Sequence, residues 1–416
     1  MGSYDLGIVA KIEAILADAK KLKDDDLPAR LGLMKQVDSL YRDLEPPTNL
    51  FFKQWISLTV FTSLDIVIKL GVFEKMKAKD NISARELGDL VGVDSGVIGY
   101  TFSNATVNTA DYESNIARTM RVLVAAQIVA STGEDTYSHT PKSLIYVRGK
   151  RTVVDSFELL TLLNKSYITI PEYLKTRPAE DLLDIRKTPY ACAYGMEGKT
   201  FYEALSANPE HLDTFNRSMS EPGPEYGIFP FSSLKEEVEA EQDRAFVVDI
   251  GGGKGQALHY IKKETSDAFG TSSKLILQER PEVLEQLSSE QRAGIELISY
   301  DFHTKQPIKG AHIYYLCQIL HNYQDHICQD ILKHIAEAMT PKSRLLIVDA
   351  VLPTQTEVGG DMAGYLIDFV GLAMGGKERT EKEVVALLNA EGLELVKIWH
   401  SKTSWQAVVE ARLKSD

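Results

Sequence analysis

A chain of 416 residues is long enough for two or three domains, and its formal net charge of −13 disfavours phosphate backbones and anionic lipid as partners. No run of about 18 uninterrupted apolar residues occurs, and the acidic, amphipathic start lacks the features of a secretory signal, so we expect no membrane span. The three cysteines, Cys192, Cys317 and Cys328, are too few and too scattered for a disulfide framework or a zinc site. We therefore expect a cytoplasmic protein without a metal.

Helical apolar spacing dominates residues 1–185, which we interpret as a separate N-terminal domain. Pro46 and Pro47 interrupt it. The stretch from Asn49 to Leu70 that follows is too apolar to face water as a helix. Because large exposed apolar surfaces mark interfaces, this stretch predicts a homodimer formed through the N-terminal helices.

A helix, turn, helix and hairpin follow in that order. Ser83 and Glu86 have the spacing of a capping box, which starts a helix. Ala117–Val129 predicts a second helix, and Glu134–Thr140 predicts a short hairpin. This order is typical of a winged-helix fold. Because basic residues are sparse in it, we interpret it as a dimerisation domain and not as a reader of DNA.

Residues 98–115 interrupt the second of these helices with a run rich in Asn, Thr and Ser. If Val97 is joined directly to Ala117, Val97, Met120, Leu123 and Val124 fall at i, i+4, i+7 and i+8, on one helical stripe. We therefore interpret 98–115 as an insertion, either a surface loop or a translated intron. It should be poorly ordered, carry no catalytic residue, and be dispensable for folding and activity.

Residues 186–416 alternate strand and helix patterns. Short, continuously apolar runs separated by helices predict a parallel sheet covered on both faces, and thus an α/β, Rossmann-like domain. A short turn joins the two final runs, which predicts a hairpin and one antiparallel strand at the sheet edge. The runs are Ala245–Ile250, Lys274–Gln278, Ile295–Ser299, Ala311–Leu316, Ser343–Ala350, Leu393–Trp399 and Ser404–Val409.

A glycine-rich turn follows the first of these strands. The strand ends with the acid Asp249, and Gly251 and Gly253 open a G-x-G-x-G pattern. Glycines let the backbone turn sharply and let a ligand approach it closely. Glu279 ends the second strand, 28 residues after Gly251, where an acid can accept hydrogen bonds from both hydroxyls of a ribose. Strand, turn, helix and acid together predict a nucleoside-binding site.

Further polar residues follow the later strands. Asp301 and Phe302 could contact an adenine, although, taken alone, a turn aspartate and a core phenylalanine are the favoured explanation. His321 follows the fourth strand, at the edge where open sheets hold ligands, and a histidine of pKa about 6.5 suits a general base. Asp349 and Glu378 could orient its ring, or could be an ordinary edge acid and a helix-start acid.

The segments VDIGGGKG, ILHNYQD and GGKERT, in this order, resemble the plant and fungal small-molecule O-methyltransferases, such as those acting on caffeate, flavonoids and sterigmatocystin. The resemblance extends over nearly the whole chain. It implies a class I methyltransferase sheet behind a winged-helix-like dimerisation domain. It also implies transfer of a methyl group from S-adenosylmethionine to a hydroxyl of a small acceptor, an aromatic or polyketide-type metabolite.

The same resemblance assigns residue roles. It implies that His321 removes the proton of the acceptor hydroxyl, with Asp349 and Glu378 beside it. Cofactor contacts are implied for Asp249, Gly251, Gly253, Glu279, Asp301, Phe302 and Cys317. Acceptor contacts are implied for Tyr190, Tyr194, Met196, Met219 and Asn322. The segment Phe215–Ser220 resembles the part that closes over cofactor and acceptor, and no metal is implied.

Three positions depart from the family pattern. Glu279 replaces the usual Asp, Cys317 stands where Lys or Arg often contacts the cofactor, and Asn322 replaces a frequent Asp. The last two leave open a pericyclase of the same fold that holds S-adenosylmethionine without consuming it. A winged-helix regulator that binds a small ligand is a third alternative, disfavoured by the acidic charge and the intact glycine turn. S-adenosylhomocysteine as a by-product would distinguish methyl transfer from both.

Overall fold

The computed structural model describes residues 3–77, 79–93, 109–149, 153–219, 224–269, 273–356, 358, 360 and 362–415. The chain divides into two compact units. The first comprises Met1–Lys21, Leu33–Asn164 and Asn208–Gly223, and the second comprises Leu22–Gly32, Lys165–Ala207 and Pro224–Asp416. This division differs from a single boundary near residue 185, because residues 165–185 group with the sheet and residues 208–223 with the helical unit.

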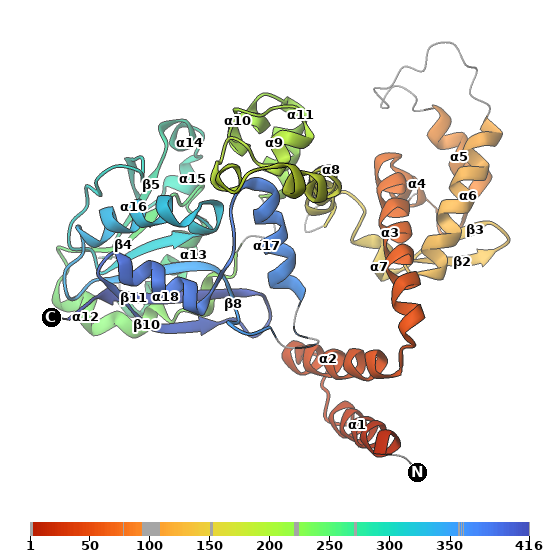
Figure 1. Ribbon diagram of the computed structural model, residues 1–416, viewed down its shortest axis with the longest axis horizontal. Helices are drawn as coiled ribbons and strands as arrows, with labels where there is room; N and C mark the ends of the chain where they lie inside the picture. Colours follow the sequence, from red (N-terminus) through yellow and green to blue (C-terminus); the bar gives the residue numbers. More distant parts are fainter. Residues whose placement is uncertain are drawn as a thin grey trace. The chain divides into compact units, whose positions relative to one another are not determined.

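Three long helices open the chain (Figure 1): α1 (Ser3–Ala19), α2 (Leu27–Leu44) and α3 (Pro47–Lys69). Pro47 starts α3, since its fixed φ suits the first helical turn and its missing N–H would have no partner there. By length and apolar composition, α3 alone among the described helices could cross a membrane. Core helices pass the same test, and its C-terminal part is packed inside the unit through Ser63, Leu64, Val67 and Ile68.

The helix–helix–hairpin order expected in the first unit is present. The backbone N–H of Ser83 donates to the Glu86 carboxylate (2.9 Å) and that of Glu86 donates to Ser83 Oγ (3.2 Å), which confirms the capping box. In the described residues the strands pair antiparallel in the order β1-β3-β2. The elements are α4 (Val72–Met76), β1 (Ile82–Ser83), α5 (Ala84–Val93), α6 (Thr109–Ala125), β2 (Val129–Gly133), β3 (Thr136–His139) and α7 (Pro141–Leu144).

The expected insertion, 98–115, is described only in part. Residues 98–108 lie outside the described residues, so nothing tests that portion. Residues 109–115 form the start of α6, so the insertion was placed too far toward the C-terminus. Of the predicted stripe, Met120 and Leu123 are fully buried and Val124 is partly buried against the same cluster, while Val97 lies outside the described residues. Once the apolar stripe of a helix is packed against the core, each further residue that joins the helix forms a backbone hydrogen bond. The helix can therefore continue into the polar residues that precede the stripe.

The second unit is built around a sheet of eight strands within the described residues (Figure 1). Their order is β10-β11-β8-β7-β4-β5-β6, with β9 beside β8. The pairs are parallel except those of β11 with β8 and β10, so the predicted final hairpin and antiparallel strand are confirmed. The strands are β4 (Ala245–Ile250), β5 (Lys274–Glu279), β6 (Glu296–Ser299), β7 (Ile313–Cys317), β8 (Arg344–Leu352), β9 (Arg379–Thr380), β10 (Leu393–His400) and β11 (Gln406–Leu413).

Apolar residues on both faces of the strands explain their continuous apolar runs. Along β7, for example, Tyr314 and Leu316 join one core cluster while Ile313 and Tyr315 join the other. α16 (Asp325–Ala336) and α18 (Glu381–Ala390) pack on the first face, and α12 (Lys235–Ala240) and α13 (Gln256–Phe269) on the second. Because helices cover both faces of the sheet, a ligand can reach the strands at their carboxyl ends.

The remaining helices connect these elements. They are α8 (Val154–Thr176), η1 (Ala179–Leu183), α9 (Pro189–Ala193), α10 (Phe201–Ser206), α11 (Pro209–Ser218), η2 (Tyr226–Ile228), η3 (Phe231–Leu234), α14 (Pro281–Glu285), α15 (Ser289–Arg292), η4 (Leu320–Asn322) and α17 (Met362–Met374).

Candidate active site

The glycine turn lies between β4 and α13. Gly251, Gly253 and Gly255 have φ angles of 67°, 57° and 75°, which are costly for any residue with a Cβ. A Cβ on Gly251 would also lie 2.8 Å from Ile319 Cδ1. The backbone of this turn is therefore available for close approach by a ligand, as predicted from the sequence.

Asp249 lies directly beneath this turn. Its side chain is fully buried, and neither carboxylate oxygen has a hydrogen-bond partner among the described residues. Burial, and to a lesser extent the charge of Glu279, raise the pKa of Asp249 to about 7. A buried carboxylate without partners is costly, so this position fits a ligand that supplies donors or positive charge.

Glu279 ends β5 next to the same turn, where the Gly251 N–H donates to the carbonyl of Gln278 at 2.8 Å. Burial raises the pKa of Glu279 above its ordinary value, although the Arg280 N–H donates to this carboxylate at 3.1 Å. The phenyl ring of Phe302 lies 3.6 Å from where a Cβ of Gly251 would be. The structure thus brings Gly251, Glu279 and Phe302 together.

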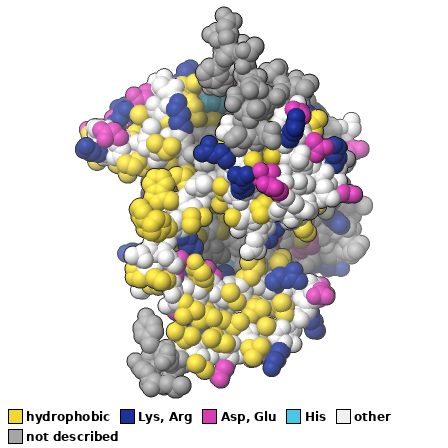
Figure 2. Space-filling view, turned by 90° about the vertical axis from the view of Figure 1, so that its right-hand side faces the viewer, with side chains coloured by type: hydrophobic (Ala, Val, Ile, Leu, Met, Phe, Trp, Pro, Cys, Tyr) yellow, Lys and Arg dark blue, Asp and Glu magenta, His cyan; other side chains and the backbone are white. Residues whose placement is uncertain are grey.

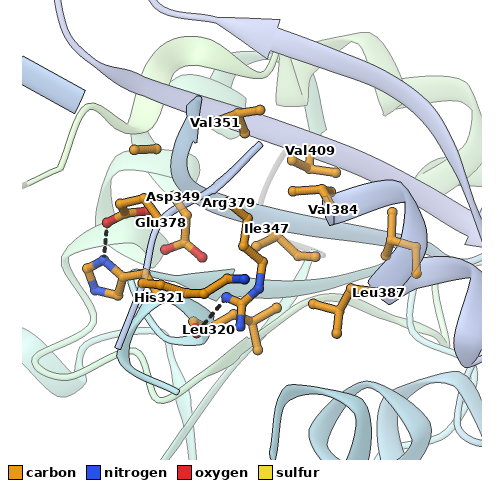
Figure 3. A pocket seen from close by; sticks show the side chains of 13 residues that line it. Leu320, His321, Ile347, Asp349, Val351, Glu378, Arg379, Val384, Leu387 and Val409 are labelled. Atoms are coloured by element: carbon orange, nitrogen blue, oxygen red, sulfur yellow. Dashed lines mark hydrogen bonds and ion pairs between the residues drawn. The ribbon is translucent and has the colours of Figure 1, made fainter. Parts of the chain in front are cut away.

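The imidazole of His321, in η4 after β7, forms a hydrogen bond with a buried carboxylate (Figure 3). Its Nδ1 lies 2.7 Å from Oε1 of Glu378, so the expected contact with an acid is present. A carboxylate next to Nδ1 favours the tautomer in which Nδ1 carries the proton. Nε2 is then the acceptor nitrogen of the neutral ring.

Two carboxyl groups govern the charge of this imidazole. Burial by itself disfavours the imidazolium, but the hydrogen bond with Glu378 and the charges of Asp349 and Glu378 outweigh it and raise the pKa of His321. Burial also raises the pKa of Asp349, although the charge of His321 opposes this. Among the described residues, Oδ1 of Asp349 and Oε2 of Glu378 have no hydrogen-bond partner. The site can therefore stabilise a proton that arrives on His321.

The segment that carries Glu378 lies against the histidine loop. The Lys377 N–H donates to the His321 carbonyl at 2.9 Å, and Gln324 Nε2 donates to the Gly375 carbonyl at 2.8 Å. A Cβ on Gly376 would collide with the His321 carbonyl, so this contact requires glycine.

Comparison with known proteins assigns the chain to a family. The family model for the O-methyltransferase domain matches residues 175–394. The O-methyltransferase hmp5 of Hypomyces subiculosus is 66% identical over 407 residues, 98% of each chain. The chain belongs to the O-methyltransferase family. The O-methyltransferase kntB of Aspergillus niger, at 32% identity over 73% of this chain and 72% of its own, is a more distant relative.

Solved structures share the fold of this chain, and one of them contains SAH. OxaC in complex with SAH and oxaline is 26% identical, with a TM-score of 0.79, and the match covers 99% of this chain and 100% of OxaC. A pericyclic reaction enzyme, at 24% identity and a TM-score of 0.77 over 98% and 100% of the two chains, shares the fold. The O-methyltransferase described here is an enzyme that uses S-adenosylmethionine, and the glycine turn, Asp249 and Glu279 suit that cofactor.

A cavity of about 190 Å³ lies in the catalytic unit of this methyltransferase. Of the residues predicted from the sequence, Asn322 lines it. The other lining residues were not predicted from the sequence. His303 and Tyr323 directly follow predicted residues, and this adjacency could have revealed them, whereas the others belong to no recognised motif. The missed residues are Ile185, Thr200, Phe201, Tyr202, His303, Tyr323 and Met374.

The other predicted acceptor residues lie elsewhere. Tyr190 is fully buried, with its ring 4.8 Å from that of Tyr194 and 4.9 Å from that of Phe201. Tyr190 therefore packs against Phe201, which lines the cavity, and does not line the cavity itself. Met196 is partly buried after α9, and Met219 is exposed and belongs to the first unit.

Cys317 and Asp301 complete the predicted set. Cys317 ends β7, and burial, together with the charges of Asp249 and Asp349, raises the pKa of its thiol well above the ordinary value. It is therefore a neutral group at the end of this strand. Asp301 is exposed, and its carboxylate accepts from the His303 N–H at 3.0 Å. No cluster of metal-binding side chains occurs in the described part of the chain.

Proposed function

We propose that this enzyme transfers a methyl group to a hydroxyl of a small aromatic or polyketide-type metabolite, with His321 as the general base. The observation that carries this proposal is the hydrogen bond between His321 Nδ1 and Glu378. It leaves Nε2 as the nitrogen that can accept a proton. The neighbouring Asn322 lines the cavity of aromatic side chains, which suits a flat acceptor.

The protein's part in the reaction follows from charge. When bound, S-adenosylmethionine supplies a methyl group on a positively charged sulfonium. This methyl group would pass from the sulfonium sulfur to the acceptor oxygen. Nε2 of His321 is available to accept the proton of the acceptor hydroxyl. Glu378 and Asp349 stabilise the resulting imidazolium. The enzyme otherwise aligns the two reactants and excludes water.

The cofactor contacts are proposed from the geometry around the glycine turn. Asp249 and the backbone at Gly251 and Gly253 would hold the amino-acid part, whose ammonium group can donate to the buried Asp249 carboxylate. Glu279 accepts hydrogen bonds from the ribose hydroxyls, as carboxylates do at this position in open sheets. Phe302, with Asp301 beside it, borders the adenine, and Cys317 faces the cofactor as a neutral group.

The function is tested by incubating the enzyme with S-adenosylmethionine and a panel of phenolic and polyketide acceptors, followed by mass spectrometry. We expect an acceptor heavier by one methyl group and an equal amount of S-adenosylhomocysteine. The second candidate is a pericyclase, which the shared fold and the departures at Cys317 and Asn322 keep open. Product formed without S-adenosylhomocysteine would establish that alternative and contradict methyl transfer.

The rate should depend on pH through His321. Transfer needs the neutral imidazole, so activity should rise with pH as the histidine loses its proton. Because the raised pKa of His321 extends its protonated state to higher pH, we expect the inflection of kcat above 6.5. In Glu378→Gln the imidazolium loses its partner, and the inflection should move to lower pH. A profile unchanged by this substitution would contradict the pairing.

We further propose that the enzyme is a homodimer formed through its N-terminal helices. Several large apolar side chains of α3 are about 60% exposed, and Figure 2 shows hydrophobic side chains gathered in broad patches on one face. Patches of this kind mark interfaces. The exposed apolar side chains of α3 include Phe51, Phe52, Trp55 and Ile56, which are 62%, 61%, 59% and 60% exposed.

Light scattering should give twice the chain mass of 46.3 kDa at micromolar concentration. The double variant Phe51→Glu/Trp55→Glu should be monomeric, because charged side chains oppose burial of this surface. Lys53→Glu, on the same helix, is the matched control and should remain dimeric. A wild-type enzyme of single-chain mass would refute the dimer.

A further inference from the structure

A buried arginine joins the histidine loop to the strand that follows Glu378. Arg379 is 5% exposed and lies in β9, which pairs with the end of β8. Its Nη1 donates to the Leu320 carbonyl (3.0 Å), and its Nη2 to the Tyr323 carbonyl (2.8 Å). Its Nε donates to Oδ1 of Asp325 at 2.9 Å. One side chain therefore holds three points of the loop, and Figure 3 shows it beside Leu320.

These contacts lie on both sides of the proposed base, His321, along the chain. The carbonyls of Leu320 and Tyr323 lie on either side of His321 and Asn322 in the sequence, so the guanidinium fixes both ends of this two-residue segment. The preceding residue, Glu378, binds His321 Nδ1. The dipeptide Glu378–Arg379 thus holds the imidazole with one side chain and the backbone that carries it with the other.

Only an arginine can make this set of contacts. Its guanidinium is planar, permanently charged and rich in donors at fixed angles, whereas a lysine ammonium is a point charge that cannot reach three separated acceptors at once. A lysine at position 379 would therefore keep the charge and lose the geometry. Replacing Arg379 with lysine therefore tests the hydrogen-bond geometry of the guanidinium separately from its positive charge.

We propose that Arg379 is a positioning residue. It fixes the backbone on both sides of His321, so that the imidazole can bind Glu378 through Nδ1 and the acceptor hydroxyl through Nε2. This inference rests on the proposed role of His321. Arg379 touches neither reactant and acts through the histidine. A displacement of about 1 Å in a reacting group can cost about 100-fold in rate, so the effect on catalysis should be large.

The test compares Arg379→Lys with Arg344→Lys. Arg344 is an equally suitable buried arginine at the opposite end of β8, where it pairs with Glu237 and Glu410. We expect Arg379→Lys to lower kcat about 10- to 100-fold and to leave S-adenosylmethionine affinity within a few-fold. Arg344→Lys should keep kcat, even if both variants lose thermal stability.

A second readout does not depend on activity. In enzyme labelled with ¹⁵N-histidine, the His321 signal is identified by its absence from His321→Ala, and its titration is followed by NMR. The pKa of His321 should fall in Arg379→Lys, since the bond to Glu378 weakens while the charge at position 379 is kept. It should not change in Arg344→Lys. If Arg379 contributes only to the stability of the fold, the pKa of His321 should be the same in Arg379→Lys as in the wild-type enzyme.

A double-mutant cycle identifies the route of the effect. If Arg379 acts through the pair of His321 and Glu378, Arg379→Lys should add little to the loss already caused by Glu378→Gln. Should Arg379→Lys fail to fold, Asp325→Asn removes one anchor of the guanidinium and should change kcat and the titration in the same direction.

The proposal is overturned if Arg379→Lys has the same kcat and the same His321 pKa as Arg344→Lys while His321→Ala is inactive. Asp325→Asn takes the place of Arg379→Lys in this comparison if the latter does not fold. Full activity of His321→Ala would instead refute the base itself. The two failures are therefore distinguishable in one set of assays.

Discussion

His321→Ala should abolish methyl transfer while leaving the affinity for S-adenosylmethionine within a few-fold. Removing a general base typically lowers the rate by about 100- to 10,000-fold. The loss should be large here because Glu378, 2.7 Å from Nδ1, leaves Nε2 as the acceptor of the hydroxyl proton. Cofactor binding should persist, because the glycine turn, Asp249 and Glu279 remain intact. The measurements are kcat with a confirmed acceptor and calorimetric titration of the cofactor.

His326→Ala is the matched control. His326 lies five residues further along, is exposed on α16, and should be replaceable without loss of kcat. Glu378→Gln should have an intermediate activity, since it keeps the size of the side chain and removes the charge that stabilises the imidazolium. Full activity of His321→Ala would show that another group, or the solvent, removes the proton.

Glu279→Ala should weaken S-adenosylmethionine binding far more than it slows transfer at saturating cofactor. The substitution leaves two ribose hydroxyls without their acceptor, and each costs about 1–3 kcal/mol if buried, or about 5- to 150-fold in Kd. Calorimetry of the free enzyme measures this loss directly. Glu279→Asp, which keeps the carboxylate on a side chain shorter by one methylene, should keep most of the affinity.

The control for this experiment is Glu282→Ala. Glu282 is an exposed acid in the first turn of α14, so its replacement removes the same charge without removing a proposed ligand contact. Equal affinities of Glu279→Ala and Glu282→Ala for the cofactor would exclude the ribose role.

The parts predicted well from the sequence are those in which short-range chemistry decides the structure. The apolar runs of β4, β5, β7 and β8 could be located because both faces of these strands are buried. The glycine turn could be located because the positive φ angles of Gly251 and Gly253 exclude most other residues. His321 could be located by its position after the fourth strand, and the resemblance added its role and that of Glu378. The hydrogen bond between them agrees with their expected proximity.

The cavity was predicted poorly because long-range packing builds it. Ile185, Thr200 and Met374 come from three distant segments, and none has a pattern that indicates a shared cavity. Tyr190 was expected to contact the acceptor, but it is fully buried against Phe201, since an aromatic ring near a site can support it as readily as line it. The start of α6 was missed because its polar residues carry no apolar period, although the stripe that follows supports a helix.

The strand order has a consequence for how this enzyme is made. β11 stands between β8 and β10, although it is the last strand in chain order. Until the ribosome has released Gln406–Leu413, one edge of β8 has no partner, and β8 carries Asp349 beneath the proposed base. Unpaired edges of this kind invite pairing with other chains. The sheet therefore keeps an unpaired edge at β8 until β11 has left the ribosome, and an incomplete chain exposes that edge.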